Sequence, residues 1–165
     1  IDPLICAKTL EGFLGIKNRL EKIGEKKNIT IYNDFAHNPS KIRASLEALK
    51  AYPGRIFAMY QPHTPFSAVN TGSEMAQEIA AVLDKNDIMI LQEIYELTKD
   101  DIGITSNNIV KDIINEGHQN ALFLPTKSDT KDFILNNVKS GDRIVIMGAH
   151  DNSLADFCKD LLASI

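Results

Sequence analysis

Short apolar runs alternate with stretches of helical periodicity from residue 29 to the end of the chain. The apolar runs predict strands at 29–33, 55–61, 87–94, 121–124 and 142–149. The stretches that follow them predict helices at 39–49, 73–85, 107–117, 129–141 and 153–165. Strands and helices in this order form right-handed βαβ units, so the sheet is expected to be mostly parallel.

Two of the strands, IMIL (88–91) and RIVIM (143–147), carry apolar residues on both faces. Such strands are typically covered by helices on both sides. Upstream, the sequence predicts a short helix at 5–14 and a hairpin at 16–34 whose turn runs through 24–28. The predicted fold class is therefore α/β: a three-layer, Rossmann-like, mostly parallel sheet with an N-terminal antiparallel hairpin edge and helices on both faces.

Polar segments follow the predicted strands. They read DFAHNP (34–39), QPHTPF (61–66), EIYE (93–96) and GAHDNS (148–153), and they hold three of the four histidines, His37, His63 and His150. The carboxyl ends of parallel strands share one edge of a sheet, and ligands bind there in open α/β folds. The sequence therefore predicts a binding site at this edge.

Each of these loops also has a structural interpretation. Asn38 and Pro39 are a good helix start, and the residues 151–153 could cap the last helix in the same way. Pro62 and Pro65 could stiffen a turn, and His63 alone is as well explained by a structural role. For Asp34 with His37 a functional role is favoured, whereas His118 is expected at the opposite edge, in solvent.

The chemistry that these residues offer is limited. A helix that begins at Pro39 presents free N–H groups to an anion. Asp34 could accept hydrogen bonds from ribose hydroxyls or order a metal-bound water, and a protonated His37 could contact a phosphate or a carboxylate. The chain has no Walker-type G-x-x-x-x-G-K-[ST], no G-x-G-x-x-G and no Cys/His cluster with zinc spacing. The residues alone predict a nucleotide or anion site that is incomplete as a catalyst.

Charge and apolar patterning exclude other classes. The net charge is -4 without a basic patch, which argues against nucleic acid as a partner. No apolar run approaches the length of a membrane span, and no signal peptide is visible. Cys158 lies at an apolar position of a helical pattern and is expected to be buried. We expect one cytoplasmic domain, residues 1–165, cut from a longer chain, since its start lacks Met.

The stretch Asp34–Pro39 resembles the D-[YF]-[AG]-H-[NH]-P signature that opens the C-terminal domain of the Mur ligases, which add amino acids to UDP-N-acetylmuramic acid with ATP. The family lead-in F-x-G-x-x-R-R-x-E is carried here by Phe13, Gly15, Arg19 and Glu21. AMYQPHT (58–64) is similar to a segment of the branch that adds L-alanine. GAHDNS takes the place of that branch's GAG loop.

The resemblance implies a role for each site residue. Asp34, Phe35 and Asn38 would bind the nucleotide, and His37 would lie near the reacting acyl phosphate as the catalytic residue. The part of the site that binds the incoming amino acid would be lined by His63, Thr64, His150 and Asn152. No residue of this chain is expected to bind metal, because a central domain, absent here, holds the P-loop and most magnesium ligands.

The resemblance also implies the reaction and the partners. ATP with Mg²⁺ would convert a carboxylate of a UDP-N-acetylmuramic acid-type substrate into an acyl phosphate, which the amine of an amino acid would attack. The enzyme's own N-terminal and central domains would be the protein partners, with no nucleic acid or membrane involved. The isolated domain is therefore expected to be inactive.

Two departures from the alanine-adding branch keep the substrate open: its GAG loop reads GAHDN (148–152) here, and its arginines after QPH are missing. That branch carries arginine just after QPH, as in QPHRYTR or QPHTFSR, but no arginine occurs here between Arg55 and Arg143. An arginine fork is the natural clamp for an amino-acid carboxylate. A murein-peptide or other Mur-type ligase and a stand-alone nucleotide-binding module therefore remain alternatives. A receiver-like scaffold fits worst, because Asp34 is preceded by Asn33 instead of a second acid.

Overall fold

The computed structural model describes residues 2–13, 15–95, 103, 105–148 and 151–165, and these contain one six-stranded sheet in the order β1-β2-β6-β3-β4-β5. The strands are β1 (Glu21–Lys26), β2 (Ile29–Asp34), β3 (Ile56–Gln61), β4 (Ile88–Leu91), β5 (Ala121–Phe123) and β6 (Arg143–Gly148). The helices are α1 (Pro3–Leu10), α2 (Pro39–Lys50), α3 (Pro65–Val82), α4 (Ser106–Asn115), α5 (Lys127–Asn137) and α6 (Ser153–Ser164). The predicted α/β fold is confirmed.

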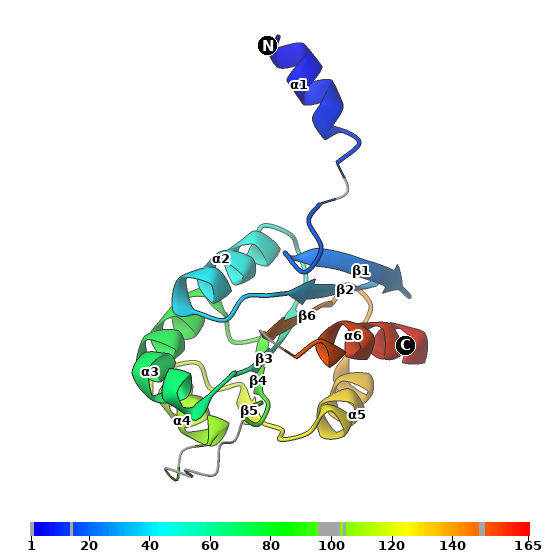
Figure 1. The fold of residues 1–165 in the computed structure, drawn as a ribbon. Coiled ribbons are helices and arrows are strands. Elements are labelled where there is room, and N and C mark those ends of the chain that lie inside the picture. The colour runs from blue at the N-terminus through cyan, green and yellow to red at the C-terminus, as the bar shows by residue number, and fades with distance from the viewer. Residues whose placement is uncertain (1, 14, 96–102, 104, 149–150) are drawn as a thin grey trace.

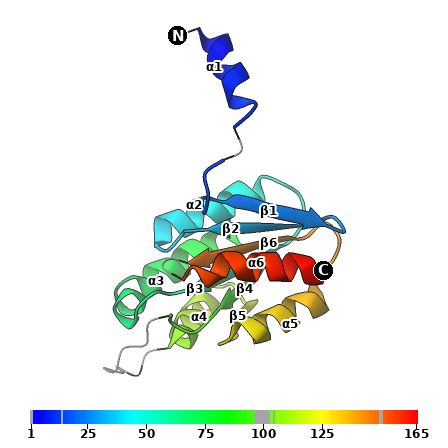
Figure 2. The same ribbon diagram turned by 45° about the vertical axis from the view of Figure 1, so that its right-hand side comes forward.

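Helices cover both faces of the sheet (Figures 1 and 2). The core on one face joins the strands to α2, α3 and α4, and the core on the other face joins them to α5 and α6. In β6, Val145 belongs to the first core and Ile144 to the second, and every residue of this strand is buried. Cys158 of α6 is fully buried, as expected from its apolar position.

The hairpin at the edge of the sheet differs from the prediction in the position of its turn. β1 and β2 pair antiparallel, but only Lys27 and Asn28 join them, at φ of 51° and 61°. Two consecutive positive φ values are typical of the tight turn that matches strand twist. Gly24, predicted in the turn, lies inside β1, where a side chain would collide with Leu162 of α6.

Helix α3 is longer than the sequence predicts. It begins at Pro65 instead of residue 73, so residues assigned to a proline-stiffened turn are helical. The hydroxyl of Thr64 accepts the N–H of Ser67 at 3.1 Å, and the N–H of Thr64 donates to the hydroxyl of Ser67 at 3.2 Å. This reciprocal capping, with proline in the first helical position, starts the helix early.

The register of the parallel strands aligns their carboxyl ends. Asp34 of β2 pairs with Met147, and Gly148 at the end of β6 pairs with Gln61 of β3. Gly148 has φ of 157°, and a Cβ there would lie 2.8 Å from Leu154 of α6. Glycine therefore lets β6 end close beneath α6. We call this side of the sheet the carboxyl edge.

Two buried carboxylates at the opposite, amino edge are paired with partly exposed basic side chains. Asp87 is 1% exposed, accepts the N–H of Ile56 at 2.8 Å and forms an ion pair with Lys50 at 2.8 Å. Asp142 forms an ion pair with Arg55 at 2.6 Å. These groups hold the strand starts in place.

His118 contradicts the prediction that it is solvated. It is 4% exposed at the amino edge, because its N–H donates to the carbonyl of Ile113 at 3.2 Å and turns the chain back after α4. Burial lowers the pKa of His118 below its ordinary value of 6.5, although the charge of Asp87 opposes this shift.

Helix α1 stands away from the sheet and the other helices (Figures 1 and 2). None of its residues is buried, and the segment 11–13 that follows it is exposed as well. Among the described helices, none is both long enough and apolar enough to cross a membrane.

Candidate functional site

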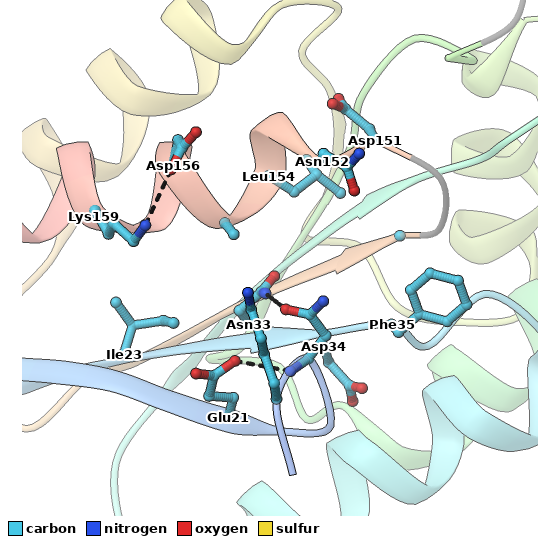
Figure 3. A pocket seen from close by; sticks show the side chains of 14 residues that line it. Glu21, Ile23, Asn33, Asp34, Phe35, Asp151, Asn152, Leu154, Asp156 and Lys159 are labelled. Carbon is cyan, nitrogen blue, oxygen red and sulfur yellow. Dashed lines mark hydrogen bonds and ion pairs between the residues drawn. The ribbon is translucent and has the colours of Figure 1, made fainter.

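Two hollows lie side by side at the carboxyl edge, and Asp34 lines both of them. The first, the α6 hollow, has a volume of about 290 Å³ and lies between β1, β2 and the first turns of α6 (Figure 3). The second, the α2 hollow, has a volume of about 310 Å³. The α2 hollow is lined by Arg19, Leu20, Asp34, Ala36, Lys41, Ala44 and Ser45.

Asp34 is placed between the hollows by the end of β2. It is 5% exposed, and one carboxylate oxygen accepts a short hydrogen bond from the hydroxyl of Ser45 on α2. Among the described residues no other hydrogen bond to this carboxylate is found. In Figure 3 the carboxylate points toward α2 and away from α6, so it faces the α2 hollow.

The aromatic ring of Phe35, next along the chain, contacts two polar side chains. The guanidinium carbon of Arg19 lies 5.1 Å from the ring centroid, and the ring of His37 meets it edge-on at 5.2 Å. Nδ1 of His37 also hydrogen-bonds the carbonyl of Phe35 at 2.8 Å. Predicted site residues Asp34, Phe35 and His37 thus form one cluster with Arg19.

The segment that carries Arg19 is fastened to the end of β2. The N–H of Phe35 donates to the carbonyl of Asn18 at 2.9 Å, and the Asn33 amide donates to the Asn18 side chain at 2.8 Å. Glu21 accepts the N–H of Asn18 at 2.8 Å. Because these bonds fix the backbone beside it, Arg19 is held over Phe35 as part of the site. The sequence pointed to Arg19 only through the family lead-in.

The far wall of the α6 hollow is the start of α6. Asp151 accepts hydrogen bonds from the N–H of Ser153 at 2.9 Å and from Nζ of Lys127 at 2.6 Å, which joins α6 to α5. Burial alone would raise the pKa of Asp151, but the bonds from Lys127 and Ser153 lower it below its ordinary value. Asn152 begins the helix without a side-chain cap bond, and its amide lines the hollow.

The two hollows differ in charge. Apart from Asp34, whose carboxylate faces the α2 hollow, the α6 hollow is bordered by three acidic residues, Glu21, Asp151 and Asp156, and by two lysines, Lys17 and Lys159. The α2 hollow combines Arg19 and Lys41 with one carboxylate. Phosphate groups are favoured in the second and disfavoured in the first. The α2 hollow is therefore the better binding site for a nucleotide at this edge.

Five predicted site residues lie outside both hollows or outside the described residues: His37, Asn38, His63, Thr64 and His150. The side chain of Asn38 accepts the N–H of Lys41 at 3.0 Å and so caps α2, as Thr64 caps α3. The ring of His63 stacks on Tyr95 with centroids 6.1 Å apart, further along the same edge. His150 is outside the described residues. The structural interpretation of Asn38 is thus confirmed, while Lys17, Lys41 and Lys159 are lining residues that the sequence did not single out.

The described residues contain no group of three or more His, Cys, Asp or Glu side chains that could hold a metal ion. The carboxylates of the α6 hollow are committed elsewhere: Asp151 to Lys127, Glu21 to the backbone of Asn18, and Asp156 to Lys159 at 3.1 Å. The described residues of the two hollows therefore form no ready site for a divalent cation.

The family assignment comes from a direct match. The family model described as Mur ligase, glutamate ligase domain, covers residues 18–150. The chain belongs to the Mur ligase family. The UDP-N-acetylmuramate–L-alanine ligase of Clostridium botulinum (strain Okra) is 35% identical over 143 residues, which are 86% of this chain and 30% of the relative. The chain thus spans about a third of the length of the curated relatives that it matches.

Solved Mur ligases share the fold. The murein peptide ligase of Psychrobacter arcticus superimposes with a TM-score of 0.68 at 25% identity, over 95% of this chain and 32% of that one. The UDP-N-acetylmuramate–alanine ligase of Thermotoga maritima gives 0.71 at 21% identity, over 96% and 33%. In both solved proteins the matching region is about a third of the chain.

Proposed function

We propose that this chain is the C-terminal, nucleotide- and amino-acid-binding part of an ATP-dependent ligase of peptidoglycan synthesis. The ligase would join an amino acid, in the first instance L-alanine, to UDP-N-acetylmuramate. The observation that carries the proposal is the cluster of Asp34, Phe35, His37 and Arg19 beside the α2 hollow in a Mur ligase fold. Relatives named as L-alanine ligases support the choice of amine.

The α2 hollow suits a nucleotide. One carboxylate oxygen of Asp34 accepts the hydrogen bond from Ser45. The other oxygen can accept hydrogen bonds from hydroxyl groups such as those of ribose. Arg19 and Lys41 border the same hollow and would neutralise phosphate charge. His37, against Phe35, lies where it could contact the transferring phosphoryl group.

The proposed reaction has two steps. The substrate carboxylate attacks the γ-phosphorus of ATP and displaces ADP, which gives an acyl phosphate. The amine then attacks the acyl carbon, phosphate leaves and the amine loses a proton, so an amide forms. The enzyme's contribution is largely positioning and charge neutralisation. Magnesium and the P-loop are assigned to the rest of a longer chain, and no step is assigned to a metal on these residues.

The identity of the amine depends on the segment after QPH. Where the alanine-adding branch carries arginine, this chain has Thr64 and Ser67, and their side chains are committed to capping α3. They offer no positive charge to an amino-acid carboxylate. A murein-peptide or another Mur-type ligase is therefore the second candidate, with His63 and Asn152 on the substrate side and His150 as the remaining predicted contact.

The test is an assay of the longer chain with ATP, Mg²⁺, UDP-N-acetylmuramate and a panel of amines, including L-alanine and a murein tripeptide. We expect amine-dependent phosphate release and a product of the mass of the amide, and both should fall at least about tenfold in Arg19→Ala. The matched control is Arg43→Ala, which removes an exposed arginine of α2 that pairs with Glu47 of the same helix and with Glu78 of α3. ATP binding without ligation of any amine would point to a stand-alone nucleotide module instead.

A further inference from the structure

A third hollow, at the amino edge of the sheet, has no part in the proposed reaction. It has a volume of about 390 Å³ and lies between α5 and the starts of β3, β4 and β5. We call it the α5 hollow. Sites for small molecules have volumes of about 300–1,000 Å³, so the α5 hollow is large enough to hold one.

The floor of the α5 hollow is apolar and consists of Ile88 of β4, Leu122 of β5 and Phe133 of α5. Leu122 pairs with Ile90, which belongs to the core beneath α5 and α6, so all three side chains lie on this face of the sheet. All three residues are only partly buried, whereas nearly every residue of β3 and β6 is buried. Helix α5 therefore leaves part of this face of β4 and β5 uncovered, and an apolar group in the hollow would remove it from water.

The rim of the α5 hollow is polar, and hydrogen bonds hold its loops in place. The side-chain amide of Asn120 donates to the carbonyl of Lys85 at 2.7 Å, which ties the loop before β5 to the loop before β4. The N–H of Asn86 donates to the carboxylate of Asp84 at 3.0 Å, and the N–H of Asp87 donates to the carbonyl of Asp84 at 3.1 Å. The rim is therefore formed before a ligand binds.

The rim holds an ammonium group that the described residues do not neutralise. Lys85 is exposed, and in the part of the chain that the structure describes no hydrogen bond or ion pair to its ammonium is found. The side chain of Asn86 makes no hydrogen bond there either, and Gln119 uses only its amide nitrogen, which donates to the carbonyl of Ile114 at 3.1 Å. None of the described lining residues is acidic. The rim therefore offers one cation and two amides to a ligand.

The other charges near the α5 hollow are paired. Arg55 lines the hollow, but its guanidinium binds both carboxylate oxygens of Asp142, at 2.6 Å and 3.0 Å. The two carboxylates closest to Lys85 in the sequence pair with Lys50 of α2, and α2 packs on the opposite face of the sheet. The charge that this hollow makes available to an anion is therefore the ammonium of Lys85.

We propose that the α5 hollow binds a small organic acid, with its carboxylate at Lys85 and an apolar body the size of an aromatic ring on the floor. A monoanion matches the single free ammonium, and the amides of Asn86 and Gln119 can hydrogen-bond to its polar atoms. An inorganic anion would leave the apolar floor in water, and an uncharged apolar molecule would leave Lys85 unused. The proposal is independent of the proposed function, because the hollow lies at the opposite edge of the sheet from Asp34.

The experiment titrates the longer chain, labelled with ¹³C in the methyl groups of isoleucine and leucine, and follows binding by NMR. The ligands are 3-phenylpropanoate, the uncharged 3-phenylpropan-1-ol and acetate. We expect 3-phenylpropanoate to bind saturably and to shift the methyl signals of Ile88 and Leu122. The alcohol should bind up to about fivefold more weakly, which is the value of an exposed charge pair, and acetate should bind most weakly because it covers little of the floor.

Variants separate the charge from the floor. Lys85→Gln changes an exposed side chain, so the fold should be intact, and we expect it to weaken 3-phenylpropanoate by about three- to fivefold and to leave the alcohol unchanged. Leu122→Ala should weaken both ligands, because it removes apolar surface from the floor. The matched control is Lys111→Gln, which changes an exposed lysine of α4 outside the hollow and should alter neither affinity.

The proposal is overturned if 3-phenylpropanoate does not bind saturably, or if it shifts only signals of the carboxyl edge. Equal affinity for the acid and the alcohol, or an acid affinity that Lys85→Gln leaves unchanged, would overturn it as well. ATP binding is measured on the same preparation. A chain that binds the acid at the α5 hollow but neither binds ATP nor ligates would uphold this site and reject the proposed function, and an active ligase that does not bind the acid would do the reverse.

Discussion

At the amino edge of the sheet, Asp87 and Asp142 are buried and each is bound by a cation from a neighbouring segment. At the carboxyl edge, Asp34 is equally buried, but its partner is the neutral hydroxyl of Ser45 and it lines two hollows. The same residue type therefore serves the fold at one edge and remains available to a ligand at the other. Burial alone does not distinguish these roles, but the charge of the partner does.

The largest expected effect is on stability and comes from the amino edge. Asp87→Ala leaves the N–H of Ile56 without its acceptor and removes the buried one of the two carboxylates that pair with Lys50. Breaking a buried ion pair from one side costs about 3–5 kcal/mol, which urea unfolding of the domain would measure. Asp84→Ala, which removes a carboxylate that is 56% exposed from the same lysine, should cost less than about 1 kcal/mol. Equal losses of stability in Asp87→Ala and Asp84→Ala would contradict the structural role assigned to the buried carboxylates of the amino edge.

A smaller effect at the amino edge depends on pH. The pKa of His118 is lowered by burial, so the unfolded chain binds its proton more tightly than the folded one. Stability from this group is therefore present above pH 6.5 and is lost as pH falls toward the lowered pKa, by up to about 1.4 kcal/mol per pH unit. Urea unfolding at pH 7.5 and 5.5 should show a shallower decline in His118→Gln. Identical declines would mean that His118 protonates freely in the folded state.

The smallest expected effect tests a residue of the carboxyl edge that the sequence assigned to the nucleotide. Asn38→Ala removes the cap of α2 and should cost about 1 kcal/mol of stability. Asn38→Asp keeps a capping oxygen and should restore most of it. ATP affinity of the longer chain should be unchanged in both. If Asn38→Asp lost ATP affinity while its stability stayed intact, Asn38 would be a nucleotide-binding residue as the sequence predicted.

Element order and fold class could be predicted because the core strands are apolar on both faces and the helices are periodic. The start of α3 could not, because Pro65 fits a turn and a first helical position equally well, and the reciprocal Thr64–Ser67 bonds decide between them. The burial of His118 was not predicted for a related reason. Its position after a helix resembles a solvated loop, and only the packing of the amino edge buries it.

The candidate site was predictable in position but not in detail. Parallel strands bring their ends to one edge, so Asp34, His63 and Asn152 lie along it as expected. Which of them share a hollow depends on side-chain direction and on the segment that carries Arg19. A backbone hydrogen bond between Asn18 and Phe35, which are distant in the sequence, fixes that segment, and no periodicity reveals it.

The central claim is that the carboxylate of Asp34 binds nucleotide in the α2 hollow. Calorimetric titration of the longer chain with ATP, comparing wild type, Asp34→Asn and Asp156→Asn, tests it most directly. Asp156 borders only the α6 hollow and is exposed, so it serves as the matched carboxylate control. We predict that Asp34→Asn weakens ATP binding about 10- to 100-fold, the value of a hydrogen bond to a charged group, while Asp156→Asn stays within about twofold of wild type. Wild-type affinity in a correctly folded Asp34→Asn variant would contradict the account.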